Sequence, residues 1–299
     1  MIQSPSSPAA GRRITGFTLV ELLVVIGIIA LLISILLPSL NRARQQAYDV
    51  QCKSNLRQLG IGMILYTNEW KAFPGARSKG AVGAQNAADW LVIWAPRVRR
   101  ALKVSSHKVF TCPTQKDEQY YWKEKSTTSP VATLVGKEEG FGYNLGESVL
   151  VEKTVKLTYG YNDWGSADVV SVPTQRGLGG DVIGNTREVR SSAVRSASNL
   201  IVLADRTLNL AYGATPSEFN VSLDPCDPQE APATIHRGGA NFLFADGHVE
   251  WRRQDEVVLF TLGETVTKWV DPAKPGKPKA VYKTRWDTIA PMWNTDNRP

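Results

Sequence analysis

The most hydrophobic part of the chain is a single segment near its N-terminus. Residues 17–37 are all apolar or small except Thr18, Glu21 and Ser34. In an α-helix, which rises about 1.5 Å per residue, a segment of this length spans roughly 30 Å, the thickness of the hydrocarbon core of a bilayer. The pattern therefore predicts a membrane-spanning helix.

The helical pattern continues beyond this segment but changes character. From Asn41 to about Tyr66 polar residues dominate, and apolar residues recur mostly at spacings of three or four. This apolar stripe consists of Leu40, Ala43, Ala47, Val50, Leu56, Leu59, Met63 and Tyr66. Pro38 lacks an N–H group and is expected to bend the helix, and Gly60 and Gly62 weaken its end. The sequence thus predicts one long helix, apolar all round in its first half and amphipathic in its second.

After residue 70 the chain is rich in turns and aromatic residues. Residues 198–205 are predicted to form a buried strand, and residues 109–113 and 157–161 resemble strand ends. The apolar run from Trp90 to Trp94 is too short to assign to a helix or to a strand.

The clearest local element lies between Ala240 and Trp251. Two alternating runs flank the pair Asp246-Gly247, and this pair favours the type I′ turn of a two-residue β-hairpin. Phe242 and Phe244 would then share one face of the first strand.

Charge gives the expected orientation of the apolar segment. Arg12 and Arg13 precede it and the remaining mass of the chain follows it, so the positive-inside rule predicts a cytoplasmic N-terminus and an exported C-terminus.

The 299 residues are 42% hydrophobic and 21% charged, as in a folded protein, with a formal charge of +7. Positive residues concentrate only at 97–103, which is either a phosphate-binding patch or a solvated face. Nucleic acid is not an expected partner.

None of three common kinds of N-terminal segment explains all the features of the apolar run. A secretory signal peptide has a core of only about 7–15 residues and then a small-x-small cleavage site, which Leu37–Leu40 does not provide. A lipoprotein signal needs a cysteine directly after the run, and the first cysteine is Cys52. A plain anchor explains the length but not Glu21, because a carboxylate in the apolar core is costly without a partner.

The segment from Gly16 to Ile26 resembles the prepilin cleavage and methylation segment of type IV pilins and type II secretion pseudopilins. That segment has a glycine, an apolar residue that is usually phenylalanine, three further residues, a glutamate and a long apolar helix. The resemblance implies that a prepilin peptidase cuts after Gly16 and methylates the new N-terminus at Phe17. Pro38 also matches the proline that commonly follows the apolar stretch in these proteins.

Cleavage would give Glu21 a partner. It would create a positively charged amine at Phe17, four residues and one helical turn before Glu21. The carboxylate would pair with this amine or with that of a neighbouring subunit, since two buried charges offset one another and either alone is costly. We therefore expect Glu21 to set the register of packed helices during assembly.

The resemblance implies an α+β, pilin-like fold, in which a long N-terminal helix packs by its second half on an antiparallel β-sheet domain. The expected organisation is a leader (1–16), a transmembrane and assembly helix (17–40), its amphipathic continuation (41–70) and an exported β-rich domain (71–299). Residues 271–279, rich in proline and lysine, are expected to be exposed. The terminal segment with Trp286, Met292 and Trp293 is expected to dock on the domain.

Residues later in the chain resemble one particular subfamily of prepilin-like proteins. His236 precedes Asp246-Gly247 by the spacing of the H-X9-DG motif, which marks a bacterial (DUF1559-like) subfamily of prepilin-like proteins. Other segments that fit the subfamily are Cys52 with Asn55–Gly60, Phe110–Pro113, Tyr159–Asn162 and Leu203–Asp205. The resemblance implies no activity.

A site at this motif is open to two interpretations. His236, Asp246 and His248, with Asp205, are residue types that bind metals. The turn alone, however, explains Asp246, and a solvent-facing strand position explains His248. A ligand site and a structural hairpin both remain open, and no metal or cofactor is expected.

The chain has three cysteines, Cys52, Cys112 and Cys226, too few for a disulfide scaffold. In an oxidising compartment one pair could form a disulfide. Cys52 with Cys112 is the expected pair, because Cys226 lies in the turn-like run Asp224–Pro228.

The chain contains no Gly-x-Ser-x-Gly, phosphate-loop or His-Glu-x-x-His motif and is not expected to be an enzyme. The expected function is that of a structural subunit, a pseudopilin or minor pilin, in a type II secretion or type IV pilus-like system. Its expected partners are the prepilin peptidase, other pilin or pseudopilin subunits and the inner membrane, which it crosses once with its globular domain in the periplasm or at the cell surface. The alternatives are a membrane-anchored exported binding module and a metal-dependent enzyme using His236, Asp246 and His248.

Overall fold

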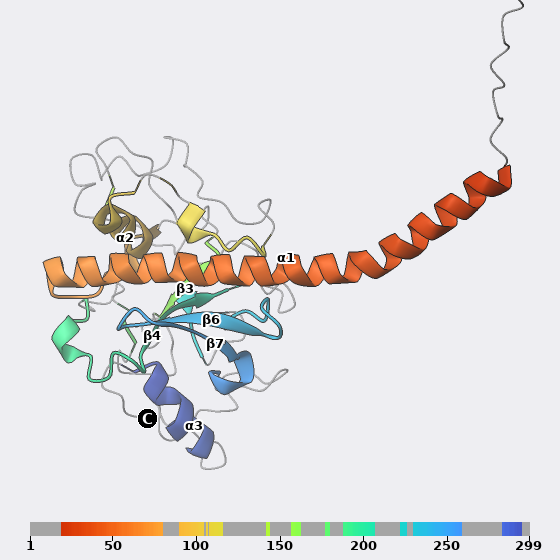
Figure 1. Cartoon of the computed structure of the whole chain (residues 1–299). Helices are drawn as coiled ribbons and strands as arrows, with labels where there is room; N and C mark the ends of the chain where they lie inside the picture. The colour runs from red at the N-terminus through yellow and green to blue at the C-terminus, as the bar shows by residue number, and fades with distance from the viewer. Residues whose placement is uncertain are drawn as a thin grey trace, which may run out of the picture. The chain divides into compact units, whose positions relative to one another are not determined.

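Figure 1 shows the computed structural model of the chain. The residues that it describes are 19–79, 90–104, 106, 108–115, 142–143, 157–162, 177–179, 188–206, 222–225, 230–258 and 283–294. They belong to two compact units, residues 1–46 and residues 47–299, and each unit is considered by itself.

The first unit contains the beginning of helix α1 (Leu19–Trp70). Every described residue from Leu19 to Gln46 is exposed, and the most apolar 18-residue window has a mean hydropathy of 3.1. The hydroxyl groups of Ser34 and Ser39 donate to helix carbonyls three residues earlier, at 2.7 and 2.8 Å. An apolar helix whose serine hydroxyls bond within it suits a single-pass membrane anchor.

Helix α1 continues through Pro38 without a break, which confirms the prediction of one long helix. The bend expected at Pro38 stays a prediction. The leader, with Gly16 and Phe17, lies outside the described residues, as do Cys226 and residues 271–279.

The second unit is organised around a five-stranded sheet with the strand order β5-β3-β4-β6-β7. Its strands are β3 (Tyr159–Asn162), β4 (Ile201–Asp205), β5 (Ser222–Leu223), β6 (Gly239–Phe244) and β7 (Val249–Arg253). Four of them are antiparallel to their neighbours, and β5 joins the edge parallel to β3. The fold is therefore α+β and pilin-like, as predicted, and the predicted strand at 198–205 is present as β4.

The second half of α1 covers one face of this sheet (Figure 1). Its buried residues Cys52, Leu56, Leu59 and Met63 share a core with Leu243 of β6. Burial follows the second half of the predicted apolar stripe, at Leu56, Leu59, Met63 and Tyr66, because the amphipathic helix turns that side to the sheet. The first half of the stripe is exposed instead, at Leu40, Ala43, Ala47 and Val50.

The opposite face of the sheet has its own core. Phe242 and Phe244 share that face, as predicted, and pack with Ile289 of helix α3 (Lys283–Ile289) and with Trp293. The indole Nε1 of Trp293 donates to the carbonyl of Val257 at 2.8 Å. The C-terminal segment therefore docks on the domain, as expected, and β4 and β6 are buried on both faces.

Smaller elements complete the second unit. The run from Trp90 to Trp94, which the sequence left unassigned, forms β2 (Trp90–Val92), which pairs with β1 (Arg77–Lys79), and the start of helix α2 (Trp94–Leu102). Short 3₁₀ helices are η2 (Lys108–Phe110), η6 (Ser191–Ala193), η8 (Gln254–Glu256) and η11 (Ala290–Met292).

Two local predictions are wrong. Residues 109–113 form no strand, because η2 occupies their start and the N–H group of Cys112 bonds to the Thr158 hydroxyl at 2.6 Å. The hairpin between β6 and β7 exists, but its turn is not type I′. Only Gly247 has a positive φ (91°), while its N–H group donates to the carbonyl of Phe244 at 2.9 Å, as in a three-residue loop.

Two glycines let α1 approach its neighbours on opposite sides. A Cβ atom on Gly60 would lie 2.7 Å from Cδ1 of Leu243 and 3.3 Å from the backbone of Gly247. A Cβ atom on Gly62 would lie 2.7 Å from Val98, in α2. The helix is thus held between the sheet and α2, and these glycines are needed for packing rather than marking the end of the helix.

We expect Gly60→Leu to lower the free energy of unfolding of the full chain by about 1–3 kcal/mol, since the added side chain must displace the buried Leu243 or the Gly247 backbone. Guanidinium unfolding in mild detergent, followed by circular dichroism, measures the change. The matched control is Gly27→Leu, because nothing lies within 4 Å of a Cβ atom on Gly27. Equal stability of the two variants would contradict the close approach.

Candidate functional site

The motif residue His236 lies in a closed, polar part of the core. Its side chain is only 2% exposed. The ring Nε2 is 3.3 Å from Oδ2 of Asp205 and 3.4 Å from Sγ of Cys112, and Nδ1 is 3.5 Å from Oδ1 of Asp49. Each ring nitrogen therefore faces a carboxylate oxygen, and Nε2 also faces a sulfur atom. The three partners come from three different segments of the chain.

A tight turn positions His236 beside β6. Its N–H and C=O groups form a two-bond bridge with Gly239, at 3.0 and 3.1 Å, around Arg237 and Gly238. Both of these residues have positive φ, 54° and 81°, as a type I′ turn requires. The indole Nε1 of Trp251 donates to the His236 carbonyl at 2.6 Å. Backbone and side-chain contacts thus fix the ring in the core.

Asn241 links the two carboxylates that face His236. Its backbone N–H group donates to Oδ2 of Asp205 at 2.8 Å, and its side-chain Nδ2 donates to Oδ1 of Asp49 at 3.0 Å. Lys53 bonds the other Asp49 oxygen at 3.0 Å. Burial acts to raise the pKa of Asp49, but the hydrogen bonds from Asn241 and Lys53 and the charges of Lys53 and His236 outweigh it and lower the pKa.

A disulfide joins Cys52 and Cys112, the pair expected from the sequence. The bond ties α1 to the segment after η2 and closes a loop with a sequence separation of 60. In the chain-entropy treatment a loop of this size stabilises the fold by roughly 4 kcal/mol. Both sulfurs lie beside the His236 cluster and belong to the same buried group of metal-ligand atoms.

Asp246 and His248 lie at the other end of β6, in the exposed hairpin loop. Oδ1 of Asp246 accepts the His248 N–H group at 3.1 Å and lies 2.6 Å from its Nδ1. The His248 ring stacks on Phe244 at 4.3 Å. These contacts stabilise the loop in the way that the structural interpretation of the hairpin expects.

The structure therefore divides the predicted site residues into two sets. Asp205 and His236 lie together in the core, whereas Asp246 and His248 pair at the surface. The three-residue site at His236, Asp246 and His248 that the enzyme alternative requires is not formed. Sequence reasoning missed Asp49 and Asn241, although Asp49 precedes Cys52 by three residues and so shares its helix face.

The basic run at 97–103 is not a uniform exposed patch. Arg99 is buried, and Arg97 forms an ion pair with Glu188 and lies over the ring of Tyr66. Burial raises the pKa of Tyr66 to about 12, so the ring stays neutral beside these charges. The arrangement favours packing of α2 over phosphate binding.

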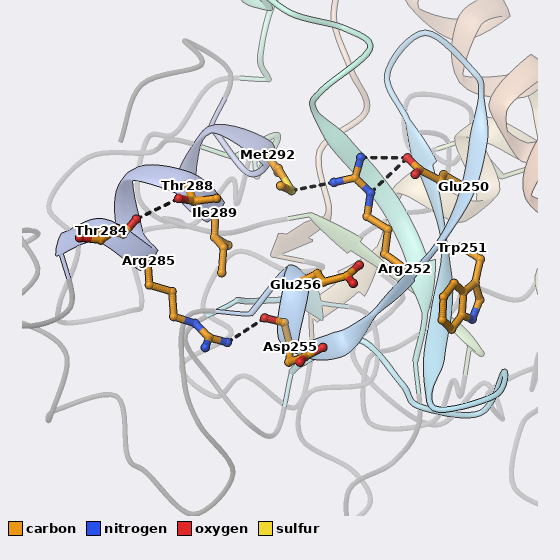
Figure 2. Close-up of a pocket in the computed structure, with 10 residues that line it drawn as sticks. All are labelled: Glu250, Trp251, Arg252, Asp255, Glu256, Thr284, Arg285, Thr288, Ile289 and Met292. Carbon is orange, nitrogen blue, oxygen red and sulfur yellow. Dashed lines mark hydrogen bonds and ion pairs between the residues drawn. The ribbon is translucent and has the colours of Figure 1, made fainter.

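A pocket of about 710 Å³ lies between β7 and α3, and Figure 2 shows the residues that line it. The side chain of Arg252 crosses it, bonding to Glu250 at 2.8 Å and to the Met292 sulfur at 3.1 Å. Arg285 donates to the carbonyl of Asp255 at 2.9 Å. These bonds link β7 to Met292 and α3 to the segment from Asp255 to Val258, and no catalytic set converges among the described residues that line the pocket.

Glu21, the remaining predicted site residue, is exposed in the first turn of α1. A carboxylate at this position is favoured by the positive end of the helix dipole. Its role in assembly stays a prediction.

We expect Asp49→Asn to destabilise the domain most at neutral pH. A carboxyl group whose pKa is lowered by folding stabilises the fold above its ordinary value, 3.8, and loses that contribution as the pH falls through the folded value. The stability difference between the native chain and Asp49→Asn should therefore be largest above about pH 4 and shrink below it. Unfolding by guanidinium at a series of pH values measures it.

The matched control is Asp246→Asn, which removes an exposed carboxylate that also contacts a histidine. It should leave the pH dependence of unfolding largely unchanged. A difference between the native chain and Asp49→Asn that stays constant with pH would contradict the role given to the Asp49 charge.

Two regions of the chain match known families. Residues 11–37 match the prokaryotic N-terminal methylation motif, and residues 41–101 match a family of proteins of unknown function, DUF1559. No curated protein and no solved structure matches the chain. Both family matches agree with the resemblance found in the sequence.

Proposed function

We propose that this chain, whose residues 11–37 match the prokaryotic N-terminal methylation motif, is a structural subunit, a pseudopilin or minor pilin, of a type II secretion or type IV pilus-like system. A prepilin peptidase removes residues 1–16 and methylates Phe17. The mature protein then assembles with other subunits through its N-terminal helix. The observation that carries this proposal is the match of residues 11–37 to the methylation motif, a range that includes the apolar and exposed start of α1.

Glu21 supplies the assembly contact. In the membrane, the mature amine at Phe17 and the carboxylate at Glu21 neutralise one another, within one subunit or between two. Apolar helices pack without strong axial preference, because any translation leaves similar surfaces in contact. A charge pair at one height removes this freedom, which supports a role for Glu21 in fixing the stagger between subunits.

The domain itself supports a structural rather than a catalytic role. At the centre of the polar cluster His236 and Asp205 are buried, and only Asp49 at its edge is partly exposed, so among the described residues there is no open cleft at the cluster that would admit a substrate. The motif residues at both ends of β6 make structural contacts, the buried ones to α1 and the exposed ones within the hairpin loop.

The proposed location follows from the same features. The helix crosses the inner membrane once, with Arg12 and Arg13 on the cytoplasmic side and the domain in the periplasm or at the cell surface. The disulfide supports this placement, since such bonds persist in oxidising compartments.

We expect co-expression with a prepilin peptidase to convert the full chain into a form that lacks residues 1–16 and carries one methyl group on Phe17. Intact mass and N-terminal sequencing of the purified protein, with and without the peptidase, measure this conversion. An unchanged mass in the presence of an active peptidase would overturn the proposal.

We further expect Glu21→Ala and the isosteric Glu21→Gln to be cleaved normally but to lose most of the subunit–subunit cross-linking in membranes, because the new amine then lacks its carboxylate. Ser34→Ala is the matched control, because the Ser34 hydroxyl donates to a carbonyl of its own helix and its loss leaves the charges intact. Cross-linking of Glu21→Gln at the native level would refute the assembly role while leaving the processing result standing.

A further inference from the structure

Four buried side chains from three parts of the fold place metal-ligating atoms around one point. Cys52, Cys112, Asp205 and His236 each offer one such atom, and these atoms all lie within 4.8 Å of one another. All four residues are buried, with exposed fractions from 0 to 3%. We propose that the chain binds one zinc ion at these four residues when the Cys52–Cys112 disulfide is reduced.

The ligand set suits zinc. Thiolate, imidazole and carboxylate are all ligands of zinc, and four of them supply the tetrahedral coordination that zinc takes in closed structural sites. Calcium and magnesium, in contrast, take sets of oxygen ligands. A tetrahedral ion with sulfurs at about 2.3 Å needs the two sulfur atoms roughly 3.8 Å apart, a separation that opens once the bond between them is broken.

The imidazole is already oriented for this role. Its Nε2 is the atom that faces both Asp205, at 3.3 Å, and the Cys112 sulfur, at 3.4 Å. Its Nδ1 faces Oδ1 of Asp49 at 3.5 Å. Metal-bound histidines typically donate their second N–H group to a carboxylate, which fixes the tautomer and the direction of the ring. Asp49 stands in that position and is itself held by Asn241.

One carboxylate oxygen of Asp205 is buried without a hydrogen-bond partner in the described part of the chain. Its side chain is fully buried, Oδ2 accepts the Asn241 N–H group, and Oδ1 has no hydrogen-bond partner among the described residues. A buried carboxylate oxygen without a partner costs free energy. A cation bound beside Asp205 would offset that cost.

The disulfide and the metal exclude one another. A dithiol reductant passes two electrons and two protons to the disulfide and is itself oxidised to a disulfide, leaving thiols at Cys52 and Cys112. Binding of Zn²⁺ then releases the two thiol protons, because thiolates are the ligands. The same cross-link between α1 and the segment after η2 is thereby kept in either redox state, by a covalent bond or by the ion.

The test uses the full chain with Cys226→Ser in mild detergent, so that its only thiols come from the pair. After reduction with a trialkylphosphine, which becomes the phosphine oxide by taking oxygen from water, Co²⁺ is added and then displaced by Zn²⁺. We expect one ion per chain, d–d absorption of tetrahedral cobalt and a near-ultraviolet thiolate-to-cobalt band. The oxidised protein should show none of these, and zinc should slow reoxidation and alkylation of the two thiols.

Variants assign the ligands. Asp205→Asn and His236→Gln should each weaken Zn²⁺ binding by more than tenfold, and Asp49→Asn should weaken it by about 10- to 100-fold through the orientation of His236. The matched control is the surface pair, Asp246→Asn with His248→Gln, which offers the same chemistry outside the cluster and should bind as the unaltered chain does.

Three results would overturn the proposal: no cobalt binding by a reduced chain that circular dichroism shows to be folded, a cobalt spectrum without the thiolate band, or unchanged affinity in Asp205→Asn and His236→Gln. If reduction alone unfolds the domain, zinc should restore the folded signal, because the free energy of metal binding then adds to that of folding. Failure of zinc to do so would also overturn it. None of these results depends on the cleavage of the leader.

Discussion

The close contact between the second half of α1 and β6 is the constraint on which the rest of the domain depends. Leu56, Leu59 and Met63 bury their side chains there, and Gly60 allows the two backbones to approach. The contact also brings one turn of the helix, with Asp49 and Cys52, to the end of the strand where His236 lies. Apolar packing thus creates the enclosure, and the polar cluster occupies one end of it.

A polar cluster in this position costs stability unless its groups pair. Burying carboxylates and an imidazole is offset only by well-directed hydrogen bonds, and hydrophobic residues of similar volume would often do as well for stability. What the cluster adds is direction. The side chain of Asn241 donates to Asp49, and its backbone N–H group donates to Asp205. A translation of α1 along the sheet would break the hydrogen bond to Asp49, whereas apolar contacts alone would oppose such a translation only weakly.

Sequence patterns predicted the elements that have a strong periodic signal. They did not predict the local structure where contacts between distant parts of the chain determine it. The long helix, the strand β4 and the β6–β7 hairpin follow from patterns that repeat within a few residues. The structure at 109–113 depends instead on Thr158 and on the disulfide partner Cys52, both distant in the chain. Gly60 looked like a helix-weakening residue because its propensity is local, whereas its function in packing depends on Leu243.

The candidate site shows the same limit. Residue types alone singled out His236 and Asp205 as candidate ligands, and the structure places these two side by side. Residue types could not separate them from Asp246 and His248, which are close in sequence to His236 and carry the same chemistry. The separation comes from the strand between them. His236 lies before β6 and Asp246 after it, so an extended backbone drives the two acid–imidazole pairs to opposite ends.

This strand also gives the H-X9-DG spacing a physical meaning. The motif places one turn on each side of the six-residue strand β6, at Arg237-Gly238 and at Gly247. The six residues extend over roughly 17 Å, and the helix from Asp49 to Gly60 rises by about the same amount. At the first end of this helix segment Asp49 contacts His236, and at its second end Gly60 lies against Gly247. The spacing therefore matches the length of α1 between these two contacts, and a shorter or longer strand would leave one of them unmade.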